Sequence, residues 1–203
     1  MLHRAEPPTA KNSSNMNRVA NPKHPIGTTL DNLKAAVTGE TGASAKYAAY
    51  AKAADAAGKT QVAKLFRAAS AAEQVHITLE SNLIRLDEPA YTNPKADAPD
   101  VPPIDLALLD AALGEMYETS DMYPGYIEKA VQEDKVAAEE VFTRAKLAES
   151  VHAELFLAAY NDLDAADDAE NFYLCPNCGY IHKGAITDPC PICYTAAAMF
   201  KEF

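Results

Sequence analysis

The sequence predicts an all-α four-helix bundle with one long crossover, followed by a small domain built around a metal. Three observations predict it. Two long stretches, 26–87 and 104–163, are rich in Ala, Leu, Lys, Glu and Gln, the residues that lose least on entering a helix. The segment between them, 89–103, holds five prolines and cannot be helical. All four cysteines fall within the last 29 residues of the 203-residue chain.

Composition limits the classes of function. The chain is 48% hydrophobic and 23% charged, which is the balance of a folded protein with a real core. Its 18 Lys and Arg residues against 29 Asp and Glu residues give a formal charge of −11, which disfavours a nucleic-acid or anionic-membrane partner. We find neither an apolar run of membrane-spanning length nor a secretory signal. We therefore expect a cytoplasmic protein.

The first helical pair begins after a proline-containing start. Residues 1–27 have no apolar period, which predicts a flexible tail. Helices are expected at about 29–57 and 60–87. Thr28 and Asp31 have the spacing of a capping box at the start of the first helix, and Gly58 stands where that helix ends and the next begins.

The second helical pair is expected at about 104–132 and 135–163. Pro124 and Gly125 predict an interruption or kink in its first helix, and Asp134 is a plausible N-cap for its second. Two short turns and one long crossover are the connectivity of a ferritin-like four-helix bundle, which we assign to 28–166. The remaining stretch, 167–203, is too short for an apolar core of its own and predicts a metal-stabilised domain.

The two helical pairs repeat one another at a spacing of 75 or 76 positions. Each offers Gly-Glu on its first helix and Glu-x-x-His on its second. The residues are Glu40, Glu73 and His76 in the first pair, and Glu115, Glu149 and His152 in the second. Side chains three apart share a helix face, so all six can point into the bundle at one depth. Two iron or manganese ions need bridging carboxylates and terminal imidazoles, so the repeat predicts a dimetal centre.

The two halves are not identical. Glu118 follows the first glutamate of the second half by three residues, whereas Ala43 holds the corresponding place in the first half. Glu118 is therefore a seventh candidate ligand, and one metal could choose between it and His76. Tyr47 and Tyr123 lie about two helical turns beyond the first glutamate of each half. They are either ordinary core residues or hydrogen-bond donors to the metal-binding carboxylates.

The cysteines form two Cys-x-x-Cys knuckles, made of Cys175, Cys178, Cys190 and Cys193. Four thiolates at this spacing bind one tetrahedral metal, either iron or zinc. Zinc would make the domain a structural ribbon, because Zn(II) does not change oxidation state. Iron would make it a one-electron carrier. Beside a dimetal site that consumes electrons, iron is the favoured interpretation.

Taken together, these residues resemble the rubrerythrins, in which a ferritin-like diiron bundle precedes a rubredoxin-like domain. The resemblance covers 28–203 and rests on the repeated glutamates and histidines, on the stretch 114–118 leading to Met122-Tyr123-Pro124, and on the four cysteines with Gly179-Tyr180. It implies that two non-haem irons are held by Glu40, Glu73, His76, Glu115, Glu118, Glu149 and His152. It also implies that the four cysteines of 167–203 hold one rubredoxin-type iron.

The resemblance has two consequences for particular residues. In the family, one iron moves between two ligands, and these correspond to His76 in the reduced state and Glu118 in the oxidised state. Tyr194 departs from the family pattern, because Gly or another small residue usually follows the second knuckle. If the backbone there needs a positive φ, Tyr194 is strained, which affects the potential of the cysteine-bound iron and not its ligands.

The function implied by the resemblance is a peroxidase that reduces hydrogen peroxide to water in defence against oxidative stress. Electrons would pass through the cysteine-bound iron from a separate NAD(P)H-dependent rubredoxin reductase or a similar donor, because the chain has no Gly-x-Gly-x-x-Gly fingerprint. The family also implies a homodimer in which the rubredoxin-like domain of one subunit approaches the diiron site of the other.

Two alternative functions come from other classes. A ferroxidase or iron-storage protein would also use a ferritin-like bundle, but a mineral store needs no dedicated electron entry point. A zinc-ribbon interaction module carried on a bundle would leave the repeated Glu and His pattern unexplained. The peroxidase accounts for both metal sites at once.

Overall fold

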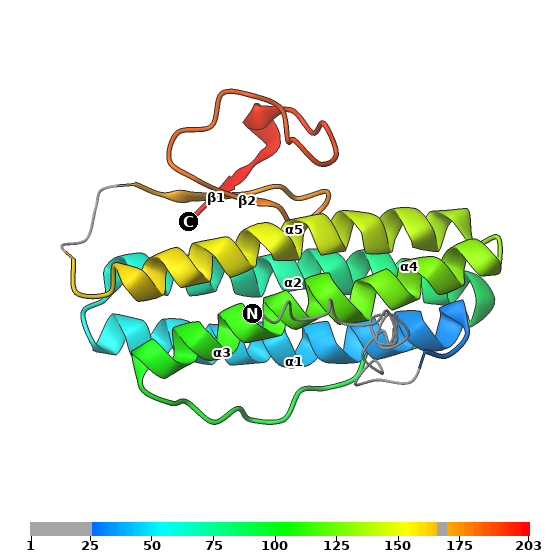
Figure 1. The fold of residues 1–203 in the computed structure, drawn as a ribbon, viewed down its shortest axis with the longest axis horizontal. Helices are drawn as coiled ribbons and strands as arrows, with labels where there is room; N and C mark the ends of the chain where they lie inside the picture. The colour runs from blue at the N-terminus through cyan, green and yellow to red at the C-terminus, as the bar shows by residue number, and fades with distance from the viewer. Residues whose placement is uncertain (1–25, 166–169) are drawn as a thin grey trace, which may run out of the picture.

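The computed structural model describes residues 26–165 and 170–203 of the chain, so nearly all of the expected tail and the expected domain boundary at 166/167 lie outside the described residues. The first of these ranges is the predicted bundle of four helical rods, with the third rod divided into three consecutive segments (Figure 1). Its helices are α1 (Thr29–Ala56), α2 (Thr60–Asp87), α3 (Ile104–Tyr117), the π-helix η2 (Glu118–Met122), α4 (Tyr123–Gln132) and α5 (Val136–Asn161).

The long connection 88–103 is extended and joins the end of α2 to the start of α3 along one side of the bundle (Figure 1). Tyr91 packs against the core, and the Ser81 hydroxyl donates to Asn93 Oδ1 at 2.7 Å. The crossover therefore reverses the direction of the second helical pair, as the prolines predicted. Within the described ranges, no helix combines the length and the apolarity that crossing a bilayer requires.

The two short turns are alike, and one expectation about them was wrong. Gly58 has a φ of 72°, and the next amide, Lys59 N–H, donates to the Ala54 carbonyl at 2.9 Å. Asp134 has a φ of 54°, and the next amide, Lys135 N–H, donates to a carbonyl near the end of α4, also at 2.9 Å. Asp134 is therefore not the N-cap of α5: it takes the left-handed conformation that closes the preceding helix, because Asp tolerates that conformation better than most residues.

The interruption in the third rod falls before the proline that predicted it. The π-helix covers Glu118–Met122, and Pro124 lies in the first turn of α4. A proline ring clashes with the carbonyl four residues earlier, so the distortion appears on the N-terminal side of Pro124. The spacing between the halves changes at the same place: it is 75 from Glu40 to Glu115 and 76 from Tyr47 to Tyr123. The wider π turn accommodates the extra residue.

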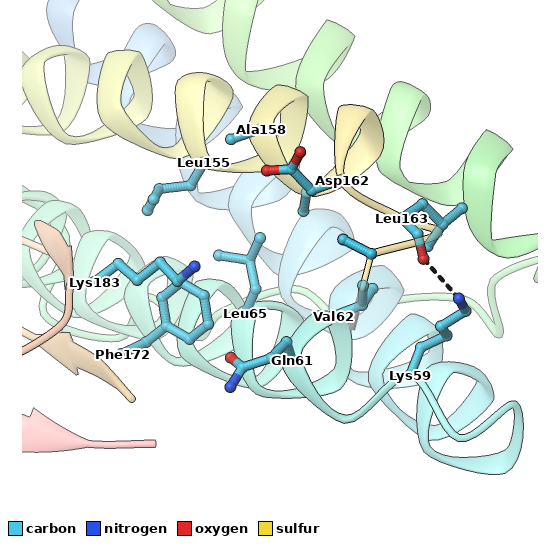
Figure 2. Close-up of a pocket in the computed structure, with 12 residues that line it drawn as sticks. Lys59, Gln61, Val62, Leu65, Leu155, Ala158, Asp162, Leu163, Phe172 and Lys183 are labelled. Carbon is cyan, nitrogen blue, oxygen red and sulfur yellow. Dashed lines mark hydrogen bonds between the residues drawn. The ribbon is translucent and has the colours of Figure 1, made fainter. Parts of the chain in front are cut away.

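The second described range is a small three-stranded antiparallel sheet that carries the cysteine knuckles. Its strands are β1 (Phe172–Leu174), β2 (Ile181–Lys183) and β3 (Lys201–Glu202), in the order β2-β1-β3. Phe172, Leu174 and Ile181 are buried in the same apolar cluster as the bundle. Figure 2 shows Phe172 beside the groove between α2 and α5, where a cleft of about 160 Å³ is left. The cysteine domain thus packs on the α2 and α5 side of the bundle.

The first prediction concerns the start of the bundle. Thr28 Oγ1 accepts from the Asp31 amide at 3.1 Å, and Asp31 Oδ2 accepts from the Thr28 amide at 3.0 Å. Thr28→Ala should lower the free energy of unfolding by about 1 kcal/mol, because the Asp31 amide loses its hydrogen-bond partner. Chemical denaturation of the metal-free protein measures it. Thr78→Ala, at an exposed position inside α2, is the control and should cost nothing. Equal losses in the two variants would contradict the role of the cap.

Candidate metal centres

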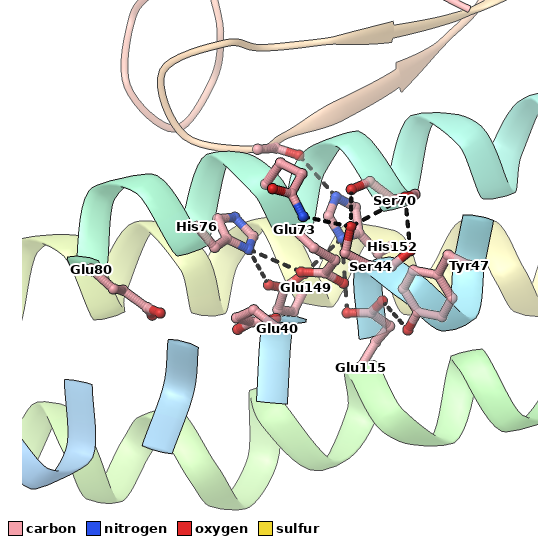
Figure 3. A network of polar contacts seen from close by, with 12 residues as sticks. Glu40, Ser44, Tyr47, Ser70, Glu73, His76, Glu80, Glu115, Glu149 and His152 are labelled. Atoms are coloured by element: carbon pink, nitrogen blue, oxygen red, sulfur yellow. Dashed lines mark hydrogen bonds and ion pairs between the residues drawn. The ribbon is translucent and has the colours of Figure 1, made fainter. Parts of the chain in front are cut away.

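The six repeated glutamates and histidines meet in the middle of the bundle. Each side chain points inward from its helix, and all six residues are at most 1% exposed (Figure 3). They come from four rods: Glu40 from α1, Glu73 and His76 from α2, Glu115 from α3, and Glu149 and His152 from α5. The sequence repeat therefore corresponds to one polar cluster.

Within the cluster, ligand atoms form two groups that share one residue. Glu40, Glu73, His76 and Glu149 have ligand atoms within 4.8 Å of one another, and so do Glu115, Glu149 and His152. His76 Nδ1 lies 2.6 Å from Glu149 Oε1, and His152 Nδ1 lies 2.6 Å from Glu149 Oε2. Glu149 thus stands between the two groups, with one oxygen toward each histidine.

Unsatisfied atoms show that the cluster fits metal ions. Among the described residues, both carboxylate oxygens of Glu73 are buried without a hydrogen-bond partner. The same is true of Glu40 Oε2 and Glu115 Oε2. A protein interior rarely leaves so many polar atoms unpaired, because each one costs free energy. Two cations with carboxylate and imidazole ligands would satisfy all of them.

Without metal, protons balance the charges of this cluster. Burial raises the pKa of Glu73 well above its usual range, and that of Glu115 to about 8. Burial alone would lower the pKa of the histidines, but the Glu149 carboxylate outweighs it and raises the pKa of His76 to about 9 and of His152 to about 10. Burial opposes ionisation of Glu149 as well, but the two imidazolium rings hold its pKa well below the usual range.

Both predicted tyrosines donate hydrogen bonds to carboxylates of the cluster. Tyr47 on α1 donates to Glu115 Oε1 at 2.7 Å, and Tyr123 on α4 donates to Glu40 Oε1 at 2.5 Å. Each tyrosine therefore donates its hydrogen bond to a glutamate of the other helical pair. Both tyrosines also belong to the buried apolar core, so the core interpretation and the hydrogen bonds to these carboxylates hold together.

Glu80 is a buried carboxylate that the sequence analysis missed. It is 0% exposed, and its Oε1 lies 3.0 Å from the Tyr123 hydroxyl. A phenol has one proton and cannot donate to both Glu80 and Glu40 as carboxylates, so one of these groups carries a proton. Burial raises the pKa of Glu80 well above its usual range. The available signal was its position four residues after His76, on the same face of α2.

Glu118 lies beside the cluster but outside its two ligand groups. It is the first residue of the π-helix and is partly buried. Burial, reinforced by the charges of Glu40 and Glu115, raises the pKa of Glu118 well above its usual range. A π turn widens the helix at this residue, so the direction of the Glu118 side chain around the helix axis differs from the direction that a regular α-helix would give it.

The four cysteine sulfurs form a second compact group, with all Sγ atoms within 4.8 Å of one another. Cys175 and Cys193 approach to 3.5 Å, as do Cys178 and Cys190, and all four are free thiols. This is the donor set of a single tetrahedral iron or zinc.

The two knuckles use the same turn with different residues. Gly179 N–H donates to the Cys175 carbonyl at 3.1 Å, and Tyr194 N–H donates to the Cys190 carbonyl at 2.9 Å. Gly179 has a φ of 79° and Tyr194 a φ of 61°, so the condition under which Tyr194 is strained is met. The tyrosine ring itself is 82% exposed, so the cost lies in the backbone.

The histidines join the two centres. His76 Nε2 lies 3.0 Å from the carbonyl oxygen of Cys178, and His152 Nε2 lies 2.9 Å from that of Gly179. A β-carbon on Gly179 would lie 2.2 Å from His76 Nε2, so this close approach requires glycine. Each imidazole therefore faces the buried carboxylates with Nδ1 and the first knuckle with Nε2.

The second prediction concerns protons displaced by metal. At pH 7 His76 and His152 are protonated in the metal-free cluster, so binding of two Fe(II) ions should release about two protons or more. Affinity should therefore rise with pH and fall in acid. Anaerobic calorimetry in buffers of different ionisation enthalpy measures the release. A Cys178→Ser, Cys193→Ser protein is used so that the cysteine site does not bind iron. Metal binding without proton release at pH 7 would contradict this charge state.

Comparisons with known proteins agree with this geometry. The family model described as rubrerythrin matches residues 31–160. Nigerythrin of Nitratidesulfovibrio vulgaris is 56% identical over 100% of both chains, and Rubrerythrin-2 of Clostridium acetobutylicum is 29% identical over 86% of this chain and 96% of its own. A solved structure described as the fully reduced, all-ferrous state of nigerythrin covers 100% of both chains with a TM-score of 0.88 and 55% identity. The chain therefore belongs to the rubrerythrin family, with a diiron centre in its bundle and an iron bound by its four cysteines.

Proposed function

We propose that this protein reduces hydrogen peroxide to water at the bundle centre, with electrons that enter through the cysteine domain from a separate NAD(P)H-dependent reductase or similar donor. The observation that carries the proposal is the pair of contacts from His76 and His152 to the carbonyls of Cys178 and Gly179. When bound, the two irons supply the electrons that cleave the O–O bond. The side chains of the bundle would bind the metals, and the hydrogen bonds of these side chains determine which of their atoms carry protons.

The carbonyl contacts determine which nitrogen of each ring is free. A carbonyl oxygen only accepts, so Nε2 of His76 and of His152 must carry the proton. When the ring loses its second proton, Nδ1 would then present its lone pair toward the metal positions. Tyr47 and Tyr123 act in the same way on the carboxylates, since each hydroxyl orients one glutamate oxygen. The ligands are thus held in place before a metal binds.

The same contacts provide a short path for electrons. Cys178 is both a ligand of the cysteine-bound iron and the acceptor of the hydrogen bond from His76. One residue therefore spans the distance from one metal site to a ligand of the other. An iron store has no use for such a path, which favours the peroxidase over the ferroxidase.

We further propose the homodimer that the family resemblance implies. In this structure the contact lies within one chain. Exchange of cysteine domains between two chains would place the same carbonyls on the histidines of the partner bundle. Leu106, Leu113 and Met116 expose apolar side chains on α3, which supports a covered face in an assembly. The four cysteines form a metal site and no disulfide, which supports a reducing compartment, for which we propose the cytoplasm.

Glu118 and His76 are proposed to share one iron in turn. Oxidation of the irons adds positive charge, which favours a carboxylate over a neutral imidazole. Glu118 has no carboxylate counterpart in the first half, where Ala43 stands, so only one of the two irons has this choice. His76 is tied to the knuckle through Nε2, and it stays in place when Glu118 replaces it as a ligand.

The third prediction tests electron entry. Cys178→Ser with Cys193→Ser should remove the cysteine-bound iron and lower NAD(P)H-coupled turnover by about a hundredfold. A chemically pre-reduced sample should still consume one equivalent of peroxide. Thr187→Ala, at an exposed position of the same domain, is the control. Coupled turnover at the wild-type rate would show that electrons bypass the cysteines, and a pre-reduced wild-type protein that leaves peroxide untouched would overturn the peroxidase itself.

The fourth prediction separates the contact from the knuckle. Gly179→Ala and Gly184→Ala place a side chain at a φ of 79° and of 89° respectively, so both strain the backbone. The new methyl group meets His76 only at position 179, because at 184 it meets the flexible Glu170 side chain. Gly179→Ala should slow reoxidation of the cysteine-bound iron by about tenfold or more, followed by its visible absorption. Equal rates in the two variants would mean that the contact plays no part.

A further inference from the structure

A hollow of about 520 Å³ opens on the side of the bundle away from the cysteine domain. It lies between α1, the crossover and the junction of α3 with the π-helix; Figure 1 shows the crossover passing below these helices. The cysteine domain packs instead on α2 and α5. The bundle is therefore approached from two different sides.

The hollow adjoins the diiron centre. Two residues of the site, Tyr47 and Glu118, form part of its lining. The Tyr47 hydroxyl is bonded to Glu115 Oε1 at 2.7 Å, and Glu118 is partly exposed here although it lies beside the cluster. A molecule that enters this hollow therefore meets Glu118, the residue that we propose exchanges with His76 as an iron ligand.

Two glycines in the lining have no structural reason to be glycine. Gly39 and Gly42 lie inside α1, where each lowers helix stability by about 1 kcal/mol relative to alanine. Among the residues that the structure describes, a β-carbon at either position would meet no atom within 4 Å, and neither glycine has a positive φ. Neither packing nor backbone conformation requires them. What they preserve is open space in front of Glu118.

The size and lining of the hollow suit a substrate larger than hydrogen peroxide. The hollow is open to solvent, and its volume falls in the range of pockets for organic ligands. Ala43, Ala96 and Pro99 give it an apolar wall. Lys46, Lys95 and Asp97 add charged groups to the lining, and Lys46 is ion-paired to Asp110 at 2.8 Å.

We propose that this hollow is the entrance for peroxides and that it admits organic hydroperoxides as well as hydrogen peroxide. The inference rests on the proposed peroxidase function. An organic hydroperoxide, ROOH, takes two electrons from the two ferrous ions and two protons; its O–O bond breaks, and ROH and water leave. The small side chains of α1 set the size of the substrate.

The test narrows the entrance without touching a ligand. Gly39→Leu with Gly42→Leu adds two side chains where there is room for them, so the protein should fold and bind iron as before. Ala35→Leu, at an exposed position of α1 outside the hollow, is the matched control. Chemically pre-reduced proteins are mixed with hydrogen peroxide or cumene hydroperoxide, and oxidation of the centre is followed by absorption. Association of azide with the oxidised centre is measured on the same proteins.

We expect wild type to be oxidised by both peroxides. The double variant should react with cumene hydroperoxide about tenfold more slowly or worse, with a smaller loss for hydrogen peroxide and azide. The control should stay within about twofold of wild type for every probe. Unchanged rates in the double variant would overturn the entrance. Wild type that reacts with hydrogen peroxide and not with cumene hydroperoxide would overturn the wider substrate class.

Azide separates this inference from the proposed function. If the pre-reduced wild type reacts with neither peroxide, the peroxidase proposal fails. Azide needs only access to the metals, so its slower association in the double variant would still support the entrance, and equal association would overturn it.

Discussion

The structure depends on charge balance in a core that holds carboxylates from every rod of the bundle. Glu40, Glu73, Glu115 and Glu149 are each 0% exposed, and an ionised carboxylate in such a place is tolerated only beside a compensating charge. Protons and the two imidazolium rings supply it in the metal-free protein, and metal ions supply it in the loaded one. The rest of the fold serves this requirement. The aromatic and alanine side chains on both sides of the cluster keep water out, and the two tyrosines donate hydrogen bonds to carboxylate oxygens of the cluster. The crossover allows the four helices to bring their polar faces to one depth.

The internal repeat explains the shape of the centre, and its irregularities explain the chemistry. The paired turns, the paired tyrosines and the paired Glu-x-x-His motifs follow one plan at a spacing of 76. One extra residue in the second half is taken up by the π-helix, and Glu118 stands at its first position. Glu80 is a second irregularity, since Phe156 holds the equivalent place in α5. A symmetric cluster would treat its two metals alike, whereas these two additional carboxylates make one metal position different from the other.

Much of this could be predicted from the sequence, because the strongest signals were local. The cap at Thr28, the turn at Gly58 and the helix-breaking prolines act within a few residues, and the repeated ligands follow a helical period. Asp134 was misjudged because a residue common at N-caps also tolerates the left-handed conformation at the end of a helix. Glu80 was missed because a single glutamate on a helix is usually solvated, and only the packed bundle shows that it is buried. The carbonyls that face His76 and His152 follow from the docking of two domains, which no local pattern encodes.

The two-sided use of each imidazole links the domains thermodynamically. The contact with the Cys178 carbonyl favours the tautomer of His76 that binds metal through Nδ1. By linkage, a metal on Nδ1 increases the free energy of docking of the cysteine domain by the same amount that docking adds to the free energy of metal binding. The His152 contact to Gly179 obeys the same reciprocity. Occupancy of the bundle is therefore sensed at the domain interface, and an undocked cysteine domain leaves the bundle with weakened ligands. Docking of the cysteine domain on the bundle and binding of metal in the bundle are therefore one cooperative process.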